Sequence, residues 1–261
     1  MSVRHEVSIP SSVRTTIDKE VATITIDRPD RLNALDPHAL RLLNETLETL
    51  ARQEAIKVVI LTGAGSRAFS SGDDIKELTK LSREELVAHI DLGQRVTGAM
   101  VDHPYLLIAA IEGYCLGGGL EIALACDMRI ASSEAIFGLP EVVYLNAVPS
   151  WGGTFRLPRL VGMARAQEML LFGRRIDGAT AWDWGLIAEI AAKGSVLSRA
   201  REIASNIPQS TQRSALSLAK RVVNSGFEMH PHAARHLEYL AAQTHLIAPA
   251  FALRPGEAKS E

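Results

Sequence analysis

The chain has 261 residues, of which 47% are hydrophobic, so it can bury a sizeable core. Its 28 basic and 30 acidic residues give a net charge of −2, which leaves no electrostatic case for binding nucleic acid or an anionic membrane. It has no run of about 18 apolar residues and no signal-peptide pattern near its start, so we expect a cytoplasmic protein that does not span a membrane. Cys115 and Cys126 lie in apolar stretches and are predicted to be buried free thiols.

Short strands are predicted along the first half of the chain, in alternation with helices. Runs of β-branched and apolar residues predict strands at 21–27, 57–63, 105–115, 127–132 and 135–139. Asp36 followed by Pro37 predicts the start of a helix over 36–52, and Ser82 with Glu85 forms a capping box for a helix over 83–102. Further helices are predicted at 162–172, 179–184, 195–206, 209–225 and 232–246.

This order of elements indicates an α/β fold that ends in a helical region. We expect two parts, a core over residues 1–194 and a helical C-terminal region over residues 195–261. Trp182 and Trp184 lie in a predicted helix of the core and are expected to pack inward. His232 and His236 are spaced like a pair of metal ligands, but no third ligand accompanies them, so a solvated helix face is favoured and no metal is predicted.

The stretch GYCLGGGLEIALACD, at residues 113–127, places three glycines in front of an apolar helical segment. It fits neither a phosphate loop, which needs Lys and Ser or Thr after the glycines, nor the G-x-G-x-x-G pattern of dinucleotide sites. It can be a strand-to-helix turn, in which glycine adopts backbone angles that other residues resist. It can also be a helix N-terminus whose free backbone N–H groups stabilise a developing oxyanion.

An oxyanion site needs a second donor and an acid or base nearby. A second glycine-bearing loop, AFSSGDDIKEL at residues 68–78, follows a predicted strand and is otherwise an ordinary turn at Gly72. Glu121 and Glu141 are the candidate acids. Glu121 lies among apolar residues, so its pKa would be raised if the side chain is buried; the alternative is a glutamate on the helix surface.

Three stretches, FSSGDDIKEL, AAIEGYCLGGGLEIALACDMRIAS and FGLPEV, resemble in order and spacing the signature stretches of the crotonase superfamily, the enoyl-CoA hydratase/isomerase family. TIDRPDRLNAL near the start and residues 152–187 fit the same pattern, and the resemblance spans residues 20–225. It implies a crotonase-like spiral of β-β-α turns with a helical C-terminal trimerisation region. It also implies an acyl-CoA thioester substrate that carries its own coenzyme A, no other cofactor, and a homo-oligomer that is a trimer or a dimer of trimers.

The resemblance also assigns roles to residues. The backbone N–H groups of Asp73 and Gly118 match the oxyanion hole that stabilises an enolate on the thioester oxygen. Glu121 and Glu141 match the two catalytic glutamates of the hydratases, and they lie 20 residues apart, as in that group. The residues implied to contact the acyl-CoA are Ser71, Asp73, Asp74, Ile75 and Gly118.

The presence of both acids favours addition of water across the C2–C3 double bond of a 2-enoyl-CoA, because one carboxyl can activate water while the other supplies a proton. One alternative is a Δ3,Δ2-enoyl-CoA isomerase, in which Glu141 alone moves a proton between C2 and C4. Another is a non-catalytic or RNA-binding homologue. The sequence offers that last alternative little support, because the helix over 41–55 carries charges of both signs.

Three features depart from the family pattern. Asp73 stands where many hydratases have alanine, and we expect its carboxylate to point away from the thioester or to find a partner. The stretch after Glu141 is one residue longer than usual, and Tyr144, Asn146 and Trp151 make it bulky, which should alter the acyl pocket wall or a loop. The C-terminal stretch THLIAPAFALRPGEAKSE differs from the family's usual close, so no coenzyme A contact from a neighbouring subunit is assigned.

Overall fold

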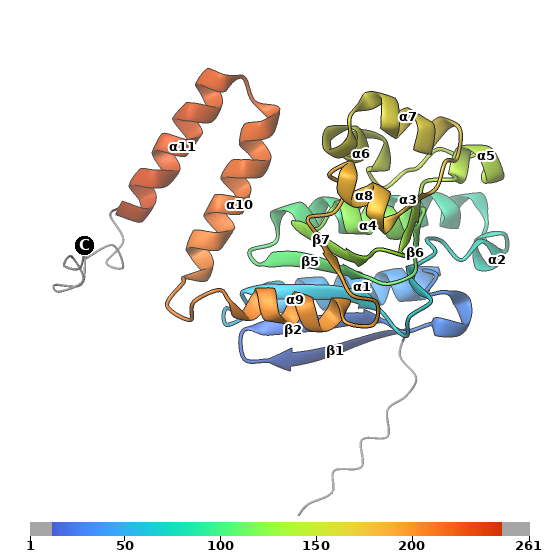
Figure 1. The fold of residues 1–261 in the computed structure, drawn as a ribbon, viewed down its shortest axis with the longest axis horizontal. Coiled ribbons are helices and arrows are strands. Elements are labelled where there is room, and N and C mark those ends of the chain that lie inside the picture. The colour runs from blue at the N-terminus through green and yellow to red at the C-terminus, as the bar shows by residue number, and fades with distance from the viewer. Residues whose placement is uncertain (1–11, 247–261) are drawn as a thin grey trace, which may run out of the picture.

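The computed structural model describes residues 12–246, and two sheets organise them (Figure 1). The larger sheet has six strands in the order β1-β2-β3-β5-β7-β10, and the smaller has four in the order β4-β6-β8-β9. The strands of the larger sheet are β1 (Val13–Asp18), β2 (Val21–Ile26), β3 (Val58–Gly63), β5 (Leu106–Ile111), β7 (Met128–Ser132) and β10 (Glu189–Ala191). Those of the smaller sheet are β4 (Ala68–Ser70), β6 (Tyr114–Leu116), β8 (Ile136–Gly138) and β9 (Ile176–Asp177). Only the β1–β2 and β8–β9 pairs of these sheets are antiparallel.

The chain passes from one sheet to the other in repeated turns. The pairs β3–β4, β5–β6 and β7–β8 each place one strand in the larger sheet and the next in the smaller. Each pair is followed by at least one helix: α2 (Ile75–Leu78) and α3 (Arg83–Asp102), then α4 (Gly118–Leu124), then α5 (Glu141–Leu145). This is the spiral of β-β-α turns that the resemblance predicted.

The single strand predicted over 105–115 is wrong, because the chain divides there between β5 and β6. Gly113, with φ +62°, lies between the two strands and leaves no room for a side chain, since a Cβ there would lie 2.1 Å from the carbonyl oxygen of Arg67. The other predicted strands match β2, β3, β7 and β8. Periodicity cannot reveal the division, because both strands are apolar.

The central strands β3 and β5 of the larger sheet are buried on both faces. In β3, Val59 and Leu61 point to the main core beneath α1 (Pro37–Ala51), whereas Val58 and Ile60 point to a second cluster. α9 (Val196–Ser205) covers that second cluster. The division expected at residue 195 stays a prediction, and the first helix beyond it packs on the sheet.

Local cap signals proved accurate. The Asp36 side chain accepts from the N–H of Ala39, and Ser82 and Glu85 form both hydrogen bonds of the capping box. The helix predicted over 162–172 corresponds to α7 (Met163–Leu171), whereas α6 (Gly153–Val161), immediately before it, was not predicted. In α8 (Gly178–Asp183), the inward packing predicted for Trp182 is wrong: its side chain is 48% exposed.

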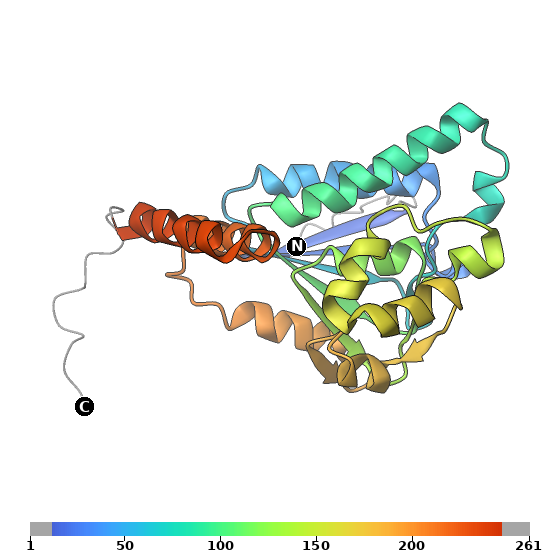
Figure 2. The same ribbon diagram turned by 90° about the horizontal axis from the view of Figure 1, so that it is seen from above.

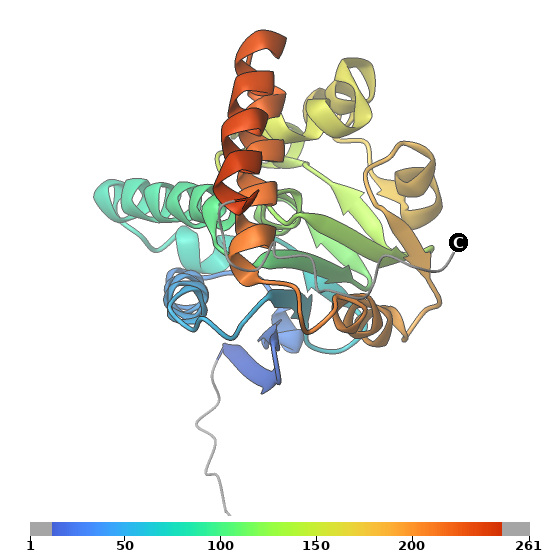
Figure 3. The same ribbon diagram turned by 90° about the vertical axis from the view of Figure 1, so that its left-hand side faces the viewer.

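α10 (Arg213–Glu228) and α11 (Pro231–Leu246) form a hairpin that projects from the rest of the chain (Figures 1 and 2). Seen from the side of the hairpin, the two helices lie against each other in front of the sheet (Figure 3). α10 is attached to the core through Lys220, whose Nζ donates to the carbonyl of Met100 and pairs with Asp127. Within residues 12–246, no helix has the combination of length and apolar character that crossing a bilayer requires.

Candidate active site

The three glycines open α4 at the point where the two glycine-bearing loops meet. Gly117 precedes the helix with φ +53° and ψ −133°, a conformation that side chains disfavour. Its N–H donates to the carbonyl of Gly138 at 3.0 Å, which ties the turn to β8. A strand-to-helix turn is therefore present, and the surroundings of the next residues determine whether its N–H groups could also stabilise an oxyanion.

The loop 70–74 lies directly against the start of α4. Gly72 has φ +87°, and a Cβ there would lie 2.9 Å from the backbone nitrogen of Gly118. The loop is held by a short bridge in which Leu35 donates to the carbonyl of Gly72 and Asp74 donates to the carbonyl of Leu35. In the part of the chain that is described, the N–H groups of Asp73 and Gly118 donate to no acceptor. The fold thus brings two free N–H donors to one place.

Glu121 lies one turn into α4 and is 2% exposed. Its Oε1 accepts hydrogen bonds from the N–H groups of Trp151 at 2.7 Å and Gly153 at 2.8 Å. Burial raises the pKa of the Glu121 carboxyl, whereas these two N–H groups oppose the rise. Of the two positions that the sequence left open, Glu121 takes the buried one, and its carboxyl is fixed in one orientation.

Glu141 begins α5 and faces the same glycine turn. A Cβ on Gly117 would lie 3.1 Å from its Oε1. Its Oε2 is buried and accepts no hydrogen bond from the residues described. Burial raises the pKa of Glu141 to about 7, and the negative charges of Glu121 and Asp73 add to the rise. Two carboxyls with raised pKa values therefore face one helix N-terminus.

Trp151 lies between α3 and the start of α4. Its indole lies between two glycines, because a Cβ on Gly93 of α3 would lie 2.0 Å from the ring and one on Gly118 would lie 2.5 Å from it. The ring is 2% exposed. Of the three bulky residues that follow Glu141, only Trp151 enters the interior, since Tyr144 is 66% exposed and Asn146 is also on the surface.

The Asp73 carboxylate has found a partner, as expected. Its Oδ1 lies 2.8 Å from Nε2 of His89 on α3, and the His89 side chain is 1% exposed. The imidazole meets the Trp151 ring edge to face, with the centroids 5.6 Å apart. No sequence signal points to His89, because it lies 16 residues from Asp73 on the far side of a helix cap.

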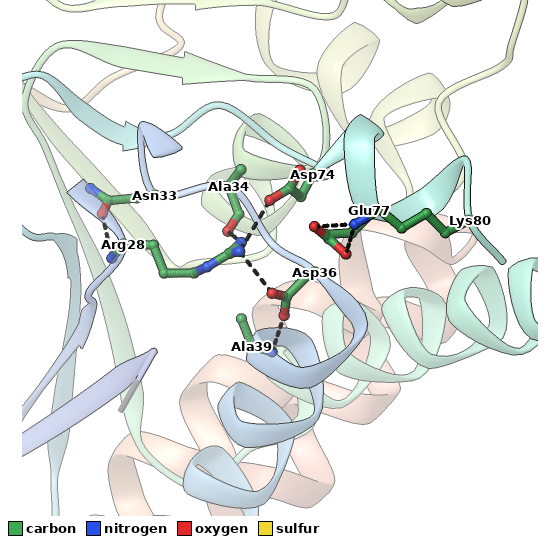
Figure 4. Close-up of polar contacts among 8 residues, drawn as sticks. All are labelled: Arg28, Asn33, Ala34, Asp36, Ala39, Asp74, Glu77 and Lys80. Carbon is green, nitrogen blue, oxygen red and sulfur yellow. Dashed lines mark hydrogen bonds and ion pairs between the residues drawn. The ribbon is translucent and has the colours of Figure 1, made fainter. Parts of the chain in front are cut away.

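A second contact that the sequence did not predict steadies the same loop (Figure 4). Nη2 of Arg28 pairs with Asp36 at 2.8 Å and with Asp74 at 3.0 Å, so the start of α1 and the loop 70–74 share one guanidinium. Asp74 is 5% exposed, and its side chain is directed inward to Arg28.

The structure gathers the four residues to which the sequence assigned chemistry: Asp73, Gly118, Glu121 and Glu141. The residues that the resemblance implied to contact acyl-CoA differ in their surroundings. The N–H of Ser71 donates to the carbonyl of Leu32, and the Asp74 side chain is held by Arg28, whereas Ile75 is 40% exposed at the start of α2. Their contacts with acyl-CoA stay predictions. Among the residues described, no cluster of side chains suited to a metal ion is found.

Comparison with known proteins identifies the class of this arrangement. Residues 16–247 match the sequence profile of the enoyl-CoA hydratase/isomerase family. The chain belongs to that family, which confirms the resemblance in its motifs.

Individual relatives agree with this assignment. The chain is 40% identical over 214 residues to a putative enoyl-CoA hydratase/isomerase, YngF, of Bacillus subtilis, with 82% of each chain covered. It is 38% identical over 214 residues to a short-chain-enoyl-CoA hydratase of Clostridium acetobutylicum, with 81% of each covered. The crystal structure of an enoyl-CoA hydratase from Bacillus anthracis superposes with a TM-score of 0.88 at 33% identity, covering 92% of both chains.

Proposed function

We propose that the protein is an enoyl-CoA hydratase that adds water across the C2–C3 double bond of a 2-enoyl-CoA. The observation that carries this proposal is the buried carboxyl of Glu121 and the partly buried carboxyl of Glu141, beside two N–H groups that have no acceptor among the residues described. Relatives named short-chain-enoyl-CoA hydratase and crotonyl-CoA hydratase, at 38% and 35% identity, support it. The substrate carries its own coenzyme A, and the residues need no further cofactor for this reaction.

The N–H groups of Asp73 and Gly118 would bind the thioester oxygen. When a nucleophile adds at C3, negative charge moves to that oxygen, and donors fixed before the reaction stabilise it without reorganising. Gly118 is also the first residue of α4, so the positive end of a short helix dipole adds to the field.

The two carboxyls divide the proton transfers. Hydrogen bonds from Trp151 and Gly153 favour the ionised form of Glu121, so Glu121 is the base that takes a proton from water. Among the residues described, Glu141 accepts only from its own backbone N–H, its Oε2 accepts from none, and its pKa of about 7 lets it hold the proton that C2 receives. Water oxygen bonds to C3, one water proton passes to Glu121, and the Glu141 proton passes to C2. The carboxyls then exchange one proton before the next turnover.

The proposal extends to assembly and location. We expect a homo-oligomer, a trimer or a dimer of trimers, formed by the helical C-terminal region, and a cytoplasmic enzyme. The balanced charge is consistent with a protein that binds neither nucleic acid nor membrane.

The test measures the loss of the conjugated absorbance of a panel of 2-enoyl-CoA thioesters, alongside 3-enoyl-CoA substrates. The Glu141→Gln and Glu121→Gln variants should each lower hydration by on the order of 10² to 10⁴, the range for a lost general acid or base, while thioester binding persists. Glu168→Gln, at a half-exposed residue of α7 that pairs with Arg174, is the control and should be normal. An isomerase would instead act on 3-enoyl-CoA and keep most of its activity in Glu121→Gln. No turnover of any thioester by the native protein would overturn the proposal.

A further inference from the structure

The hydrogen bond between Asp73 and His89 fixes a carboxylate that lies on the same residue as a proposed oxyanion donor. In the proposed mechanism, the Asp73 N–H must stabilise negative charge on the thioester oxygen, yet the same residue carries a carboxylate. The charge of Asp73 is felt in the site, because it contributes to the raised pKa values of both Glu121 and Glu141. A carboxylate free to turn toward the enolate would oppose its formation.

His89 is placed to prevent this. Its Nε2 lies 2.8 Å from the Asp73 Oδ1, and because a carboxylate only accepts, Nε2 is the donor. The imidazole is fixed from two sides: it is part of α3, and its ring packs edge to face with Trp151. Trp151 in turn touches Gly118, which carries the second N–H of the pair. One buried cluster therefore links both donors.

We infer that His89 is a positioning residue for the proposed hydratase: it holds the Asp73 carboxylate toward α3, so that the Asp73 N–H can stabilise the enolate without interference from its own side chain. This inference rests on the proposed function. His89 acts through Asp73 and exchanges no proton with the substrate.

Removal of the His89 side chain should lower activity only while the Asp73 carboxylate is present. His89→Ala should lower kcat by on the order of 10- to 100-fold, less than the complete loss of an oxyanion donor, with KM little changed. Asp73→Ala keeps the backbone N–H and removes the carboxylate, so its kcat is the reference for the double variant. The double variant should match Asp73→Ala. If His89 served packing alone, the loss caused by His89→Ala would persist in the double variant.

Two further variants test whether the hydrogen bond of His89, rather than the loss of any histidine, causes the effect. His89→Gln keeps an N–H donor at a similar reach and should recover much of the activity lost in His89→Ala. His38→Ala removes an exposed histidine of α1 and should leave kcat unchanged. Absence of recovery in His89→Gln, combined with a normal circular dichroism spectrum, would count against the hydrogen bond.

A readout without turnover separates this inference from the proposed function. Saturated butyryl-CoA, labelled with ¹³C at the thioester carbonyl, is bound to each variant, and the infrared frequency of the carbonyl is recorded. A polarised carbonyl absorbs at lower frequency, so His89→Ala should move the band toward its value in solution, and the double variant should move it back. If the native protein shifts the carbonyl band but hydrates no enoyl-CoA, the proposed hydratase reaction is wrong, whereas the positioning role of His89 still holds. The inference would be overturned if the carbonyl frequency is the same in the native protein and in His89→Ala, or if butyryl-CoA does not bind.

Discussion

The Glu141 carboxyl sets the pH dependence expected of this protein. Its pKa is raised to about 7 by burial and by the charges of Glu121 and Asp73, and the proposed reaction needs its protonated form. Raising the pH through about 7 therefore removes the proton that C2 must receive, and kcat/KM should fall about tenfold per pH unit above that point. Initial rates on the best enoyl-CoA between about pH 6 and pH 9 test this. A profile that stays flat or rises across that range would contradict the assignment of Glu141 as the proton donor.

Gly118 contributes a close contact as well as an N–H. In Gly118→Ala the new Cβ would lie 2.5 Å from the Trp151 ring, so the variant should lose about 1–3 kcal/mol of stability by overpacking. The loss would obscure any effect on catalysis. Pairing the change with Trp151→Leu makes room for the methyl group while the backbone N–H of residue 151 still reaches Glu121.

The two interpretations of the glycine run then separate. If the Gly118 N–H is an oxyanion donor, the double variant should regain stability in urea unfolding yet keep a loss in kcat on the order of 10² to 10³ relative to Trp151→Leu alone. If the glycines form only a turn, the double variant should match Trp151→Leu in kcat.

At the scale of single residues, the sequence indicated which side chains are functional candidates but not which groups surround them. Glu121 stood out because an ionisable side chain is unusual among the apolar residues of such a helix, and in the structure it is buried. Its partners could not be foreseen, because the N–H groups of Trp151 and Gly153 come from a turn about 30 residues away that has no periodicity. His89 and Arg28 were missed for the same reason: their partners are brought close only by the spiral.

At the scale of elements, an ion pair between Lys220 and Asp127 is one of the contacts that hold α10 to the core. The Lys220 side chain is 2% exposed, and its Nζ lies 2.9 Å from Asp127. Lys220→Met keeps the volume but leaves Asp127 without its cation. The expected cost is about 3 kcal/mol, the low end for breaking a buried pair, because Asp127 keeps some contact with solvent. Urea unfolding measures it. Lys80→Met, which removes a surface pair with Glu77, is the matched control and should hardly move the midpoint.

Elements with signals in their own residues were predicted well, and elements defined by distant contacts were not. The caps at Asp36 and Ser82 act within one turn, so α1 and α3 began where the sequence indicated. α6 starts at Gly153 after a glycine with φ +109° and contains Pro158, features that suggest a loop. It forms a helix at a place where Gly153 also contacts Glu121, so tertiary contacts support what the local sequence does not.

At the scale of the whole molecule, the hairpin of α10 and α11 leaves apolar side chains in solvent. The most exposed large ones are Val223, Phe227, Met229, Tyr239 and Leu240. Beside α10 runs a groove of about 820 Å³ that is lined in part by Phe155, Leu160 and Phe227. Exposed apolar surface of this extent favours association.

Sedimentation at micromolar concentration should therefore show a trimer or a dimer of trimers. Phe227→Glu should shift the distribution toward monomer, because a charge at the interface costs free energy on burial. Val87→Glu, at an exposed position on α3, serves as the control and should leave the assembly intact. A native chain that sediments only as a monomer would contradict the prediction.

The position of the Trp151 indole between Gly93 and Gly118 has an evolutionary consequence. None of the three positions can change freely, because a methyl group at either glycine would collide with the ring. A lineage that gains alanine at residue 93 or 118 must first acquire a smaller residue at 151, and one that keeps the indole must keep both glycines. Residue size at these three positions should therefore covary among homologues, and the order in which the substitutions arose should be recoverable from reconstructed ancestors.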